Sequence, residues 1–259
     1  MPADREPEHN IPDTEPSGPF VYADTGIIRA DIGHVAASLA GGTVAIVGAG
    51  GTGSVVLDLL CKTPVNRIII IDGDRAEAHN AFRWPGAMAL EDLSDSPFKV
   101  DYFARVYGRM HLGIEPFPEH LQPGNLAILD DVDFVFVCVD SIDARRFLIP
   151  ELEKRNLAFI DAGLGLTLSD DQLIGLVRVT TSTPAARAHV HDKTRIPLFG
   201  SDDDDLYRSN IQVADLNMLA GVLAIIQYKQ LRGFYHDSEA EYHTIYATDG
   251  NCIINQDRL

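Results

Sequence analysis

A glycine-rich segment near residue 50 carries the residue types that a nucleotide phosphate needs. The apolar run Thr43–Val47 leads into the first glycine, and a helix-forming sequence follows the last one. In a nucleotide-binding βαβ unit, the first glycine makes the tight turn, the next lets the main chain approach a phosphate, and the third lets the helix lie close to the strand. The free amides at the start of that helix favour an anion. The sequence therefore predicts a phosphate-binding loop formed by Gly48, Gly50, Gly51, Gly53 and Ser54.

Polar and ionisable side chains follow this loop along the chain. A second apolar run, Arg67–Ile71, ends at Asp72, whose carboxylate can accept hydrogen bonds from a ribose hydroxyl. Further polar residues follow in the order Asp74, Asn80, Arg83, Lys99, Asp140 and Arg145. Each of them also has a plain structural interpretation: Asn80 and Asp140 can cap helices, and Lys99 can lie on a solvated helix surface. Taken alone, the glycine loop and Asp72 also fit a nicotinamide-dependent oxidoreductase.

The elements that must position these residues alternate between short apolar runs and helical patterns. Further strands are expected at 134–139, 158–161 and 173–180, an extended edge at 115–121, and a closing hairpin at 242–247 and 252–255. Helices are expected at 31–39, 53–62, 98–110, 143–154 and 211–231, and a turn at Gly163 and Gly165. Residues 75–95 are expected to form a loop that can contain short helices, and 181–209 a polar, irregular segment. Short continuous apolar runs are typical of buried parallel strands. We therefore expect an α/β fold, Rossmann-like, with a mostly parallel sheet, helices on both faces and an antiparallel C-terminal extension.

Composition limits the classes of partner and compartment. The chain has 259 residues with 38 acids against 21 bases, a formal net charge of −17. This balance disfavours nucleic-acid binding, which needs phosphates to be neutralised by Lys and Arg. The polar residues within 211–231 argue against a membrane span. Three separated cysteines predict a reducing, cytoplasmic compartment, and no zinc site is expected because no CxxC motif occurs. Residues 1–20, rich in Pro, Asp and Glu, are expected to form a disordered acidic tail, and 21–259 a single domain.

The order and spacing of these motifs resemble the adenylating enzymes of the ubiquitin-activating superfamily, of the ThiF, MoeB and HesA type. The family pattern is GxGGxGS, an aspartate pair, N-x-x-R, a lysine on the following helix, and D-N-x-x-x-R. The matching residues are Gly48–Ser54, Asp72 with Asp74, Asn80 with Arg83, Lys99, and Asp140 with Arg145, and Ser141 replaces the second Asn. The resemblance covers roughly residues 40–180, and more loosely the rest.

The resemblance implies a single ATP-binding adenylation domain at 21–259 that uses ATP and Mg²⁺. Arg83, Lys99 and Asp140 would be catalytic, and Asp140 would hold the metal, since Mg²⁺ prefers carboxylate and phosphate oxygen. Asn80, Arg83 and Lys99 would stabilise the triphosphate and the charge that grows on pyrophosphate. The implied nucleotide-binding set is Gly48, Gly50, Gly51, Gly53, Ser54, Asp72, Asp74, Asn80, Arg83, Lys99 and Arg145.

The implied substrate is the C-terminal carboxylate of a ubiquitin-like or sulfur-carrier β-grasp protein. The products would be an acyl-adenylate and pyrophosphate, and a separate conjugating protein is a further expected partner. The resemblance also implies a homodimer, in which the 211–231 helix is an interface element and Arg29 is the plausible arginine for the partner's ATP site. Adenylation of a small peptide or of an RNA-base carboxylate is a related option within the family.

The chain departs from the family pattern at its cysteines and at one aromatic residue. Relatives often carry a cysteine in the loop before the long helix, whereas no cysteine lies between Cys138 and Cys252. Transfer through a crossover-loop cysteine is therefore not expected, and Cys252 is the remaining exposed nucleophile to consider, since Cys61 and Cys138 are expected to be packed thiols. Trp84 replaces the common glutamine and is expected to alter the pocket wall. The missing cysteine leaves open a non-catalytic scaffold subunit.

Overall fold

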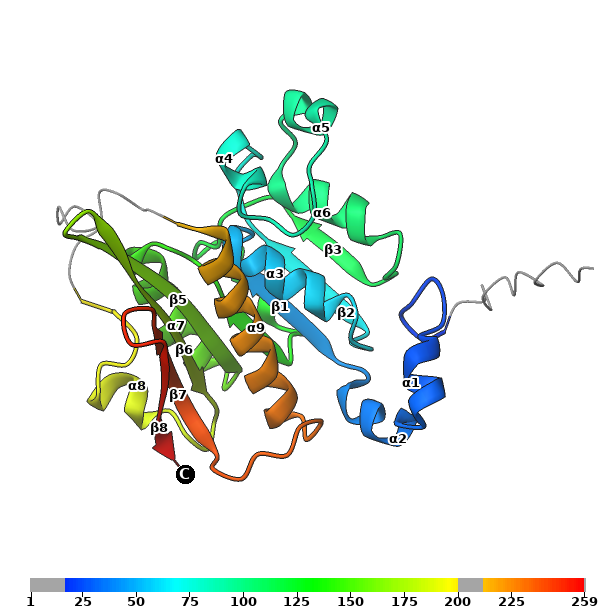
Figure 1. The fold of residues 1–259 in the computed structure, drawn as a ribbon. Helices are drawn as coiled ribbons and strands as arrows, with labels where there is room; N and C mark the ends of the chain where they lie inside the picture. Colours follow the sequence, from blue (N-terminus) through cyan, green and yellow to red (C-terminus); the bar gives the residue numbers. More distant parts are fainter. Residues whose placement is uncertain (1–16, 200–211, 259) are drawn as a thin grey trace, which may run out of the picture.

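A single eight-stranded sheet forms the centre of the molecule in a computed structural model that describes residues 17–199 and 212–258. Its strand order is β3-β2-β1-β4-β5-β6-β7-β8 (Figure 1). The strands are β1 Thr43–Val47, β2 Arg67–Ile71, β3 Ile114–Phe117, β4 Phe134–Val137, β5 Ala158–Ser169, β6 Gln172–Ser182, β7 Glu241–Ala247 and β8 Cys252–Arg258. Strands β3, β2, β1, β4 and β5 run parallel, and β6 to β8 extend the sheet antiparallel.

Helices cover both faces of this sheet. The α-helices are α1 Thr25–Ala30, α2 Gly33–Ala36, α3 Gly51–Leu60, α4 Ala78–Ala81, α5 Leu90–Asp95, α6 Lys99–Tyr107, α7 Ile142–Lys154, α8 Ala188–Asp192 and α9 Ala214–Leu231. Short 3₁₀ helices lie at Ala37–Leu39 and Leu126–Leu129. Helices α3, α6 and α9 contribute to the core on one face, and α7, α8 and 126–132 to the core on the other. Because both faces are covered, the central parallel strands β1, β2 and β4 are almost entirely apolar and buried. The predicted fold class is confirmed.

The order in which the chain adds strands to the sheet reverses at β1. After β1 the chain builds β2 and β3 on one side, and then crosses to build β4 and β5 on the other. In such sheets, ligands bind beyond the carboxyl ends of the strands where the order reverses. This edge therefore brings together the glycine loop after β1, the acids after β2 and the loop between β4 and α7.

The turn predicted at Gly163 and Gly165 is wrong. Strand β5 continues through both glycines, pairing with β6 as far as Ser169 opposite Gln172, and the hairpin turns at Asp170 and Asp171. A Cβ on Gly163 would lie 2.6 Å from Nη2 of Arg178. The glycine therefore marks the close approach of an arginine across the strand, one of the uses of glycine inside strands.

The segment 75–95 contains two short helices, α4 and α5, as its pattern allows. The irregular segment expected at 181–209 is corrected at its start, because it completes β6 and then forms α8. The long helix begins at Ala214, since Val213 is its N-cap, and Ile211 lies outside the described residues. Of the predicted tail, only 17–20 are described, and Phe20 pairs with His111 there.

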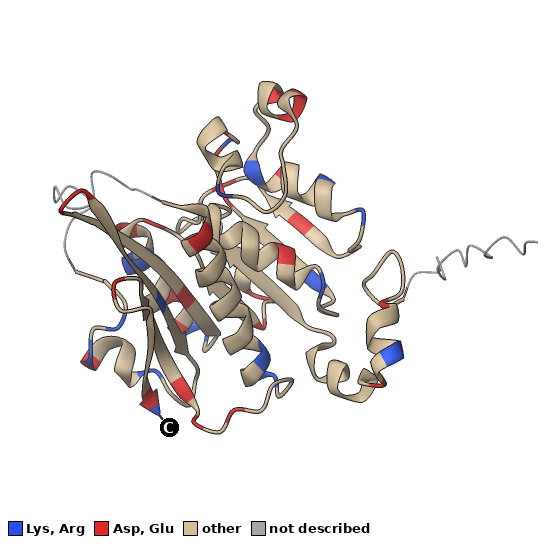
Figure 2. Ribbon diagram, viewed as in Figure 1, with Lys and Arg blue, Asp and Glu red and all other residues tan. Residues whose placement is uncertain are grey.

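The surface carries its acids in separate regions. Figure 2 shows acidic residues, in red, on α5 and at the tip of the β5–β6 hairpin, which lie at distant parts of the fold. Within the described ranges, no helix is both long and apolar enough to cross a membrane.

A buried histidine makes stability depend on pH. His243 on β7 is 2% exposed, and its Nδ1 lies 3.0 Å from Oγ1 of Thr180. Burial, reinforced by the positive charges of Arg195 and Arg178, lowers the pKa of His243 from 6.5 to about 4. The folded state therefore binds its proton only at lower pH than the unfolded chain does.

We expect the free energy of unfolding to decrease as the pH falls from 6.5 to about 4. In this window the unfolded chain binds more protons, so protonation favours unfolding, by about 2–3 kcal/mol in total for this group. Urea denaturation at a series of pH values measures the slope. His243→Asn, which keeps a hydrogen-bonding group near Thr180, should flatten the slope in this window, and an unchanged slope would contradict the assignment.

Candidate functional site

A cleft of about 920 Å³ lies at the carboxyl ends of the central strands. It runs from the glycine loop, past the ends of β2 and β4, to the floor formed by β5 and β6. The predicted site residues that line it are Gly48, Gly50, Gly51, Asp72, Asp74, Asn80, Arg83, Lys99, Asp140 and Arg145. The structure therefore brings together side chains spread over almost one hundred positions of the sequence.

The glycine loop has the geometry that its sequence predicts. Gly48 has φ +96°, a left-handed conformation that favours glycine, and its amide donates to the carbonyl of Ile71 at 2.8 Å. A Cβ on Gly53 would lie 1.8 Å from the carbonyl oxygen of Gly48, so only glycine lets α3 begin so close to the strand. Nothing lies within 4 Å of a Cβ built on Gly50, which lines the cleft. The loop thus leaves its main chain open at the start of α3.

Gly53 and Ser54 support this loop from behind and are not among the residues that line the cleft. The Ser54 side chain is fully buried, and its hydroxyl donates to the carbonyl of Gly51 at 2.8 Å. Asn217 of α9 contacts the same turn, because its Oδ1 accepts from the hydroxyl of Thr52 at 3.0 Å. Helix α9 therefore contributes directly to the shape of the phosphate loop.

The two aspartates after β2 hold a lysine between them. Asp72 accepts from the amides of Ala49 and Asp74 at 2.7 and 2.8 Å, so it ties the glycine loop to the end of β2. Lys99 Nζ lies 2.6 Å from Oδ2 of Asp74 and 3.6 Å from Oδ1 of Asp72, and the lysine is 7% exposed. Burial raises the pKa of Asp74, but the hydrogen bonds and positive charges of Lys99 and His120 together outweigh this and hold the pKa below its usual value. Lys99 is thus a fixed cation at the wall of the cleft.

Asn80 and Arg83 lie on one wall, on and just after α4. Asn80 is 2% exposed, and its Oδ1 accepts from the amide of Glu77 at 2.9 Å in a capping box. Arg83 Nη1 donates to Gln212 at 2.6 Å, while Nε is buried and has no hydrogen-bond partner among the described residues. Burial lowers the pKa of Arg83, and the negative charge of Asp140 opposes that shift. A buried donor on a cationic side chain in a cleft fits an anionic ligand.

Asp140 and Arg145 belong to the loop that joins β4 to α7. Asp140 is exposed in the cleft, and the helix cap next to it is Ser141, which accepts from the amide of Ala144 at 3.2 Å. Arg145 is 5% exposed and donates to the main-chain carbonyls of Val139 and Asp140. Its Nε also donates to Asp161 at 2.9 Å. In this structure Arg145 fixes the loop that carries Asp140.

The residues of the cleft wall fit Mg²⁺ only together with phosphate oxygens. Among the described residues, no three His, Cys, Asp or Glu side chains gather in an arrangement suited to a metal ion. Mg²⁺ is usually held by one or two carboxylates, with substrate phosphates and waters completing the shell. Asp140 lines the same cleft as the phosphate loop, and its charge acts on Arg83, so it is suited to such a shared site.

The thiols offer little nucleophilic chemistry in this cleft. Cys138 is the one cysteine among the described residues that line it, and burial raises the pKa of its thiol far above neutral. Burial does the same to the pKa of Cys61, which is fully buried. Cys252 is exposed at the start of β8 and does not line the cleft. Since reactive cysteines are those that ionise readily, the cleft presents no activated thiol within the described ranges.

Trp84 and Arg29 both lie outside the lining of this cleft. Trp84 does not alter the pocket wall: it is 4% exposed and packs in the core, with its ring stacked on Tyr102 at 5.4 Å. Arg29 is exposed on α1, away from the cleft of its own chain (Figure 1).

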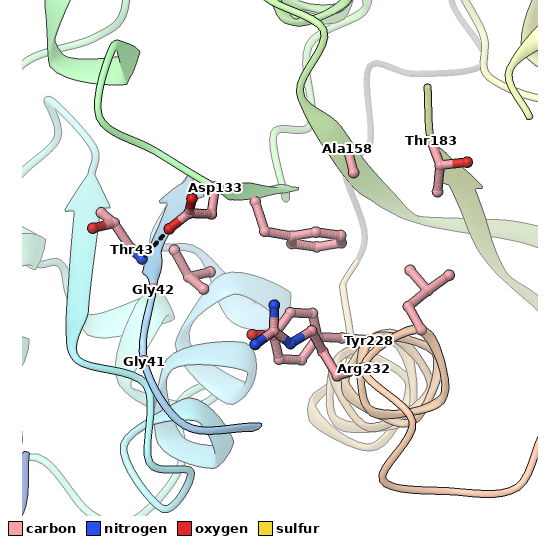
Figure 3. A pocket seen from close by; sticks show the side chains of 11 residues that line it. Gly41, Gly42, Thr43, Asp133, Ala158, Thr183, Tyr228 and Arg232 are labelled. Atoms are coloured by element: carbon pink, nitrogen blue, oxygen red, sulfur yellow. Dashed lines mark hydrogen bonds between the residues drawn. The ribbon is translucent and has the colours of Figure 1, made fainter. Parts of the chain in front are cut away.

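A second, smaller cavity of about 240 Å³ lies at the opposite ends of the strands. Figure 3 shows Tyr228 and Arg232 of α9 facing the ends of β1 and β4, where Asp133 accepts from the amide of Thr43 at 2.7 Å. None of the predicted site residues lines this cavity. The larger cleft is therefore the candidate site.

Sequence reasoning missed several residues that build the cleft. His120 lies 3.3 Å from Asp74, Gln212 bonds Arg83, Asn217 bonds Thr52, and Arg178 lies on the floor. A signal existed for Gln212 and Asn217, because they are polar residues in or beside an otherwise apolar helix pattern. No such signal marked His120 or Arg178.

Curated proteins of known name resemble the chain in sequence. The ubiquitin-like modifier-activating enzyme 5 of Branchiostoma floridae is 25% identical over 193 residues, which are 70% of this chain and 46% of that protein. The enzyme of the same name from Caenorhabditis elegans is 25% identical over 210 residues, 74% of this chain and 48% of that protein. The chain thus spans about half the length of the curated relatives it matches.

Solved structures share the fold. MccB of E. coli with MccA-N7isoASN has a TM-score of 0.69 at 17% identity, covering 91% of this chain and 73% of that chain. MccB with ATP has a TM-score of 0.61 at 19% identity, covering 86% and 66%. PaaA has a TM-score of 0.65 at 17% identity, covering 91% and 74%. A model of the ThiF family matches residues 30–238, and the chain belongs to the ThiF family.

Proposed function

We propose that the chain is an ATP-dependent adenylyltransferase that activates a carboxylate at the end of a protein or peptide. A carboxylate oxygen of the substrate would bond to the α-phosphorus of ATP, the bond to the β-phosphate oxygen would break, and pyrophosphate would leave. The observation that carries the proposal is the grouping of the glycine loop, Arg83, Lys99 and Asp140 around one cleft.

Each wall of the cleft has a role in this reaction. The open main chain at Gly50 and the start of α3 would bind the phosphates, and Asp72 would face the ribose. Arg83 and Lys99 would stabilise the negative charge that moves onto pyrophosphate, as preorganised cations do in phosphoryl transfer. Mg²⁺, held by Asp140 and phosphate oxygens, would neutralise charge on the phosphates and polarise them.

The substrate we propose is the C-terminal carboxylate of a ubiquitin-like or sulfur-carrier β-grasp protein. Relatives named ubiquitin-like modifier-activating enzyme 5 support a protein substrate, and MccB, solved with MccA, supports a peptide as the alternative. Because no activated thiol lines the described cleft, the adenylate would pass to a nucleophile from another molecule, such as the cysteine of a conjugating protein. A homodimer, with Arg29 reaching the partner's cleft, belongs to the same proposal.

The test is exchange of labelled pyrophosphate into ATP, with purified small β-grasp proteins ending in Gly-Gly and, separately, their C-terminal peptides. Exchange with a whole protein and not with its peptide supports a β-grasp substrate, whereas exchange with both supports a peptide substrate. A β-grasp protein lacking its last glycine is the control and should give none. A chain that binds ATP yet exchanges with no carboxylate substrate would instead be a non-catalytic scaffold.

A further inference from the structure

A buried carboxylate lies directly behind the loop that carries Asp140. Asp161 on β5 is fully buried, with Oδ2 at 2.9 Å from Nε of Arg145 and Oδ1 at 2.5 Å from Nη2 of Arg178. Burial alone would raise the pKa of Asp161, but the two arginines outweigh it and hold the pKa below its usual value. The residue is therefore an anion at neutral pH, and no step of the proposed reaction uses it.

The contacts of Arg145 show how the Asp161 carboxylate acts on the loop of Asp140. Arg145 is a rigid fork: Nε binds Asp161, Nη1 binds the carbonyl of Asp140 at 3.1 Å, and Nη2 binds the carbonyl of Val139. Those two carbonyls belong to the residues that precede Ser141, the N-cap of α7. The planar guanidinium, anchored on one side, can therefore fix the main chain on the other side.

The second arginine ties this anchor to the floor of the cleft. Arg178 on β6 crosses β5 above Gly163, where any Cβ would collide with it, and its Nη1 donates to Thr180 at 3.0 Å. Asp161 is thus fixed from two strands, so the position of Arg145 is set by the sheet and not by the loop itself.

We propose that Asp161 is a positioning residue for metal binding: by holding Arg145 against the carbonyls of Val139 and Asp140, it aims the Asp140 carboxylate at the shared Mg²⁺ site. The inference rests on the proposed function, because it assumes that Asp140 binds the metal. It differs from a stabilising role, since a residue that only stabilises the fold does not change the contribution of metal to nucleotide binding.

The test is calorimetry of ATP binding in the presence of Mg²⁺ and in the presence of EDTA. The affinity with Mg²⁺ divided by the affinity with EDTA, called here the metal ratio, gives the contribution of the metal to ATP binding. Asp161→Asn should lower this ratio about tenfold or more, the loss typical when a partner of a metal ligand is removed. Asp140→Asn should lower it as well. In the double variant the loss should equal that of Asp140→Asn alone, because two residues acting through one contact are not additive.

A matched control removes a similar buried anion elsewhere. The Asp257 side chain is 3% exposed and binds Arg195 at 2.7 Å and also Lys193, without contacting the loop of Asp140. Asp257→Asn should lower Tm but leave the metal ratio unchanged. If Asp161→Asn does not fold, Arg145→Lys keeps the charge beside Asp161 but loses the fork, and should show the same loss of the metal ratio.

The outcomes separate the two proposals. A wild-type chain that binds no ATP would overturn the proposed function. A wild-type chain with metal-dependent ATP binding, and an unchanged ratio in Asp161→Asn, would overturn the positioning role alone. Additive losses in the double variant would also overturn it.

Discussion

Asparagine in place of Asp140 is expected to slow pyrophosphate exchange by about 10²–10³-fold, the loss typical when one preorganised electrostatic contact to a transition state is removed. Asp140 is exposed in the cleft, and the cap of α7 is Ser141. Replacement of an exposed carboxylate away from a cap changes stability little. The variant should therefore keep its Tm while it loses exchange and the Mg²⁺ dependence of ATP binding.

The matched control lies three residues further along the same segment. Asp143 is an exposed acid in the first turn of α7, and its partner is Arg146 at 2.5 Å on the surface. Asp143→Asn removes the same charge from the same end of the helix without reaching the cleft, so exchange should be nearly unchanged. Exchange that survives in Asp140→Asn, or that falls equally in both variants, would refute the role given to Asp140.

Two alanine substitutions in the glycine loop should separate folding from nucleotide binding. In Gly53→Ala, the new Cβ would lie 1.8 Å from a main-chain oxygen, which cannot move aside as a flexible side chain can. We expect a loss of at least about 3 kcal/mol in the free energy of unfolding, at the upper end of the range for overpacking. Urea denaturation measures this loss.

Gly50→Ala places its methyl group in open space, with φ already at −75°. The apo protein should therefore unfold at the same denaturant concentration as the wild type. The methyl group, however, stands where the main chain would approach a phosphate, so ATP affinity in calorimetry should fall about tenfold or more. A Gly50→Ala variant that binds ATP normally would show that the phosphates do not contact this part of the loop.

Much of the fold could be predicted from the sequence, because it depends on residues whose types are restricted by local geometry. Apolar runs such as Arg67–Ile71 are buried on both faces, so a short continuous pattern sufficed to identify parallel strands. The roles of Gly48 and Gly53 depend on a positive φ and a close approach within a few residues, and both were predictable. The predicted site residues that line the cleft lie there because their motifs stand at the ends of these strands.

The features that could not be predicted from the sequence depend on contacts between distant segments. Gly163 gave the signal of a turn, but its small size serves Arg178 from the neighbouring strand, fifteen positions on. Trp84 follows Arg83 in sequence, yet it points into the aromatic core with Tyr102 while Arg83 lines the cleft. Asp161 lies inside a strand and had no motif of its own. Its importance arises only from two arginines that the fold brings to it.

Calorimetric titration with ATP and Mg²⁺, run beside a titration with NAD, decides whether this cleft is an ATP site. We expect one ATP site per chain, weakened strongly by Lys99→Ala because this variant loses a buried cation between Asp72 and Asp74 from the cleft wall. The ATP-binding role of the cleft accounts for both results. It also predicts no comparable affinity for NAD. Binding of NAD in place of ATP, or ATP binding that is indifferent to Lys99, would contradict the assignment of this cleft to ATP.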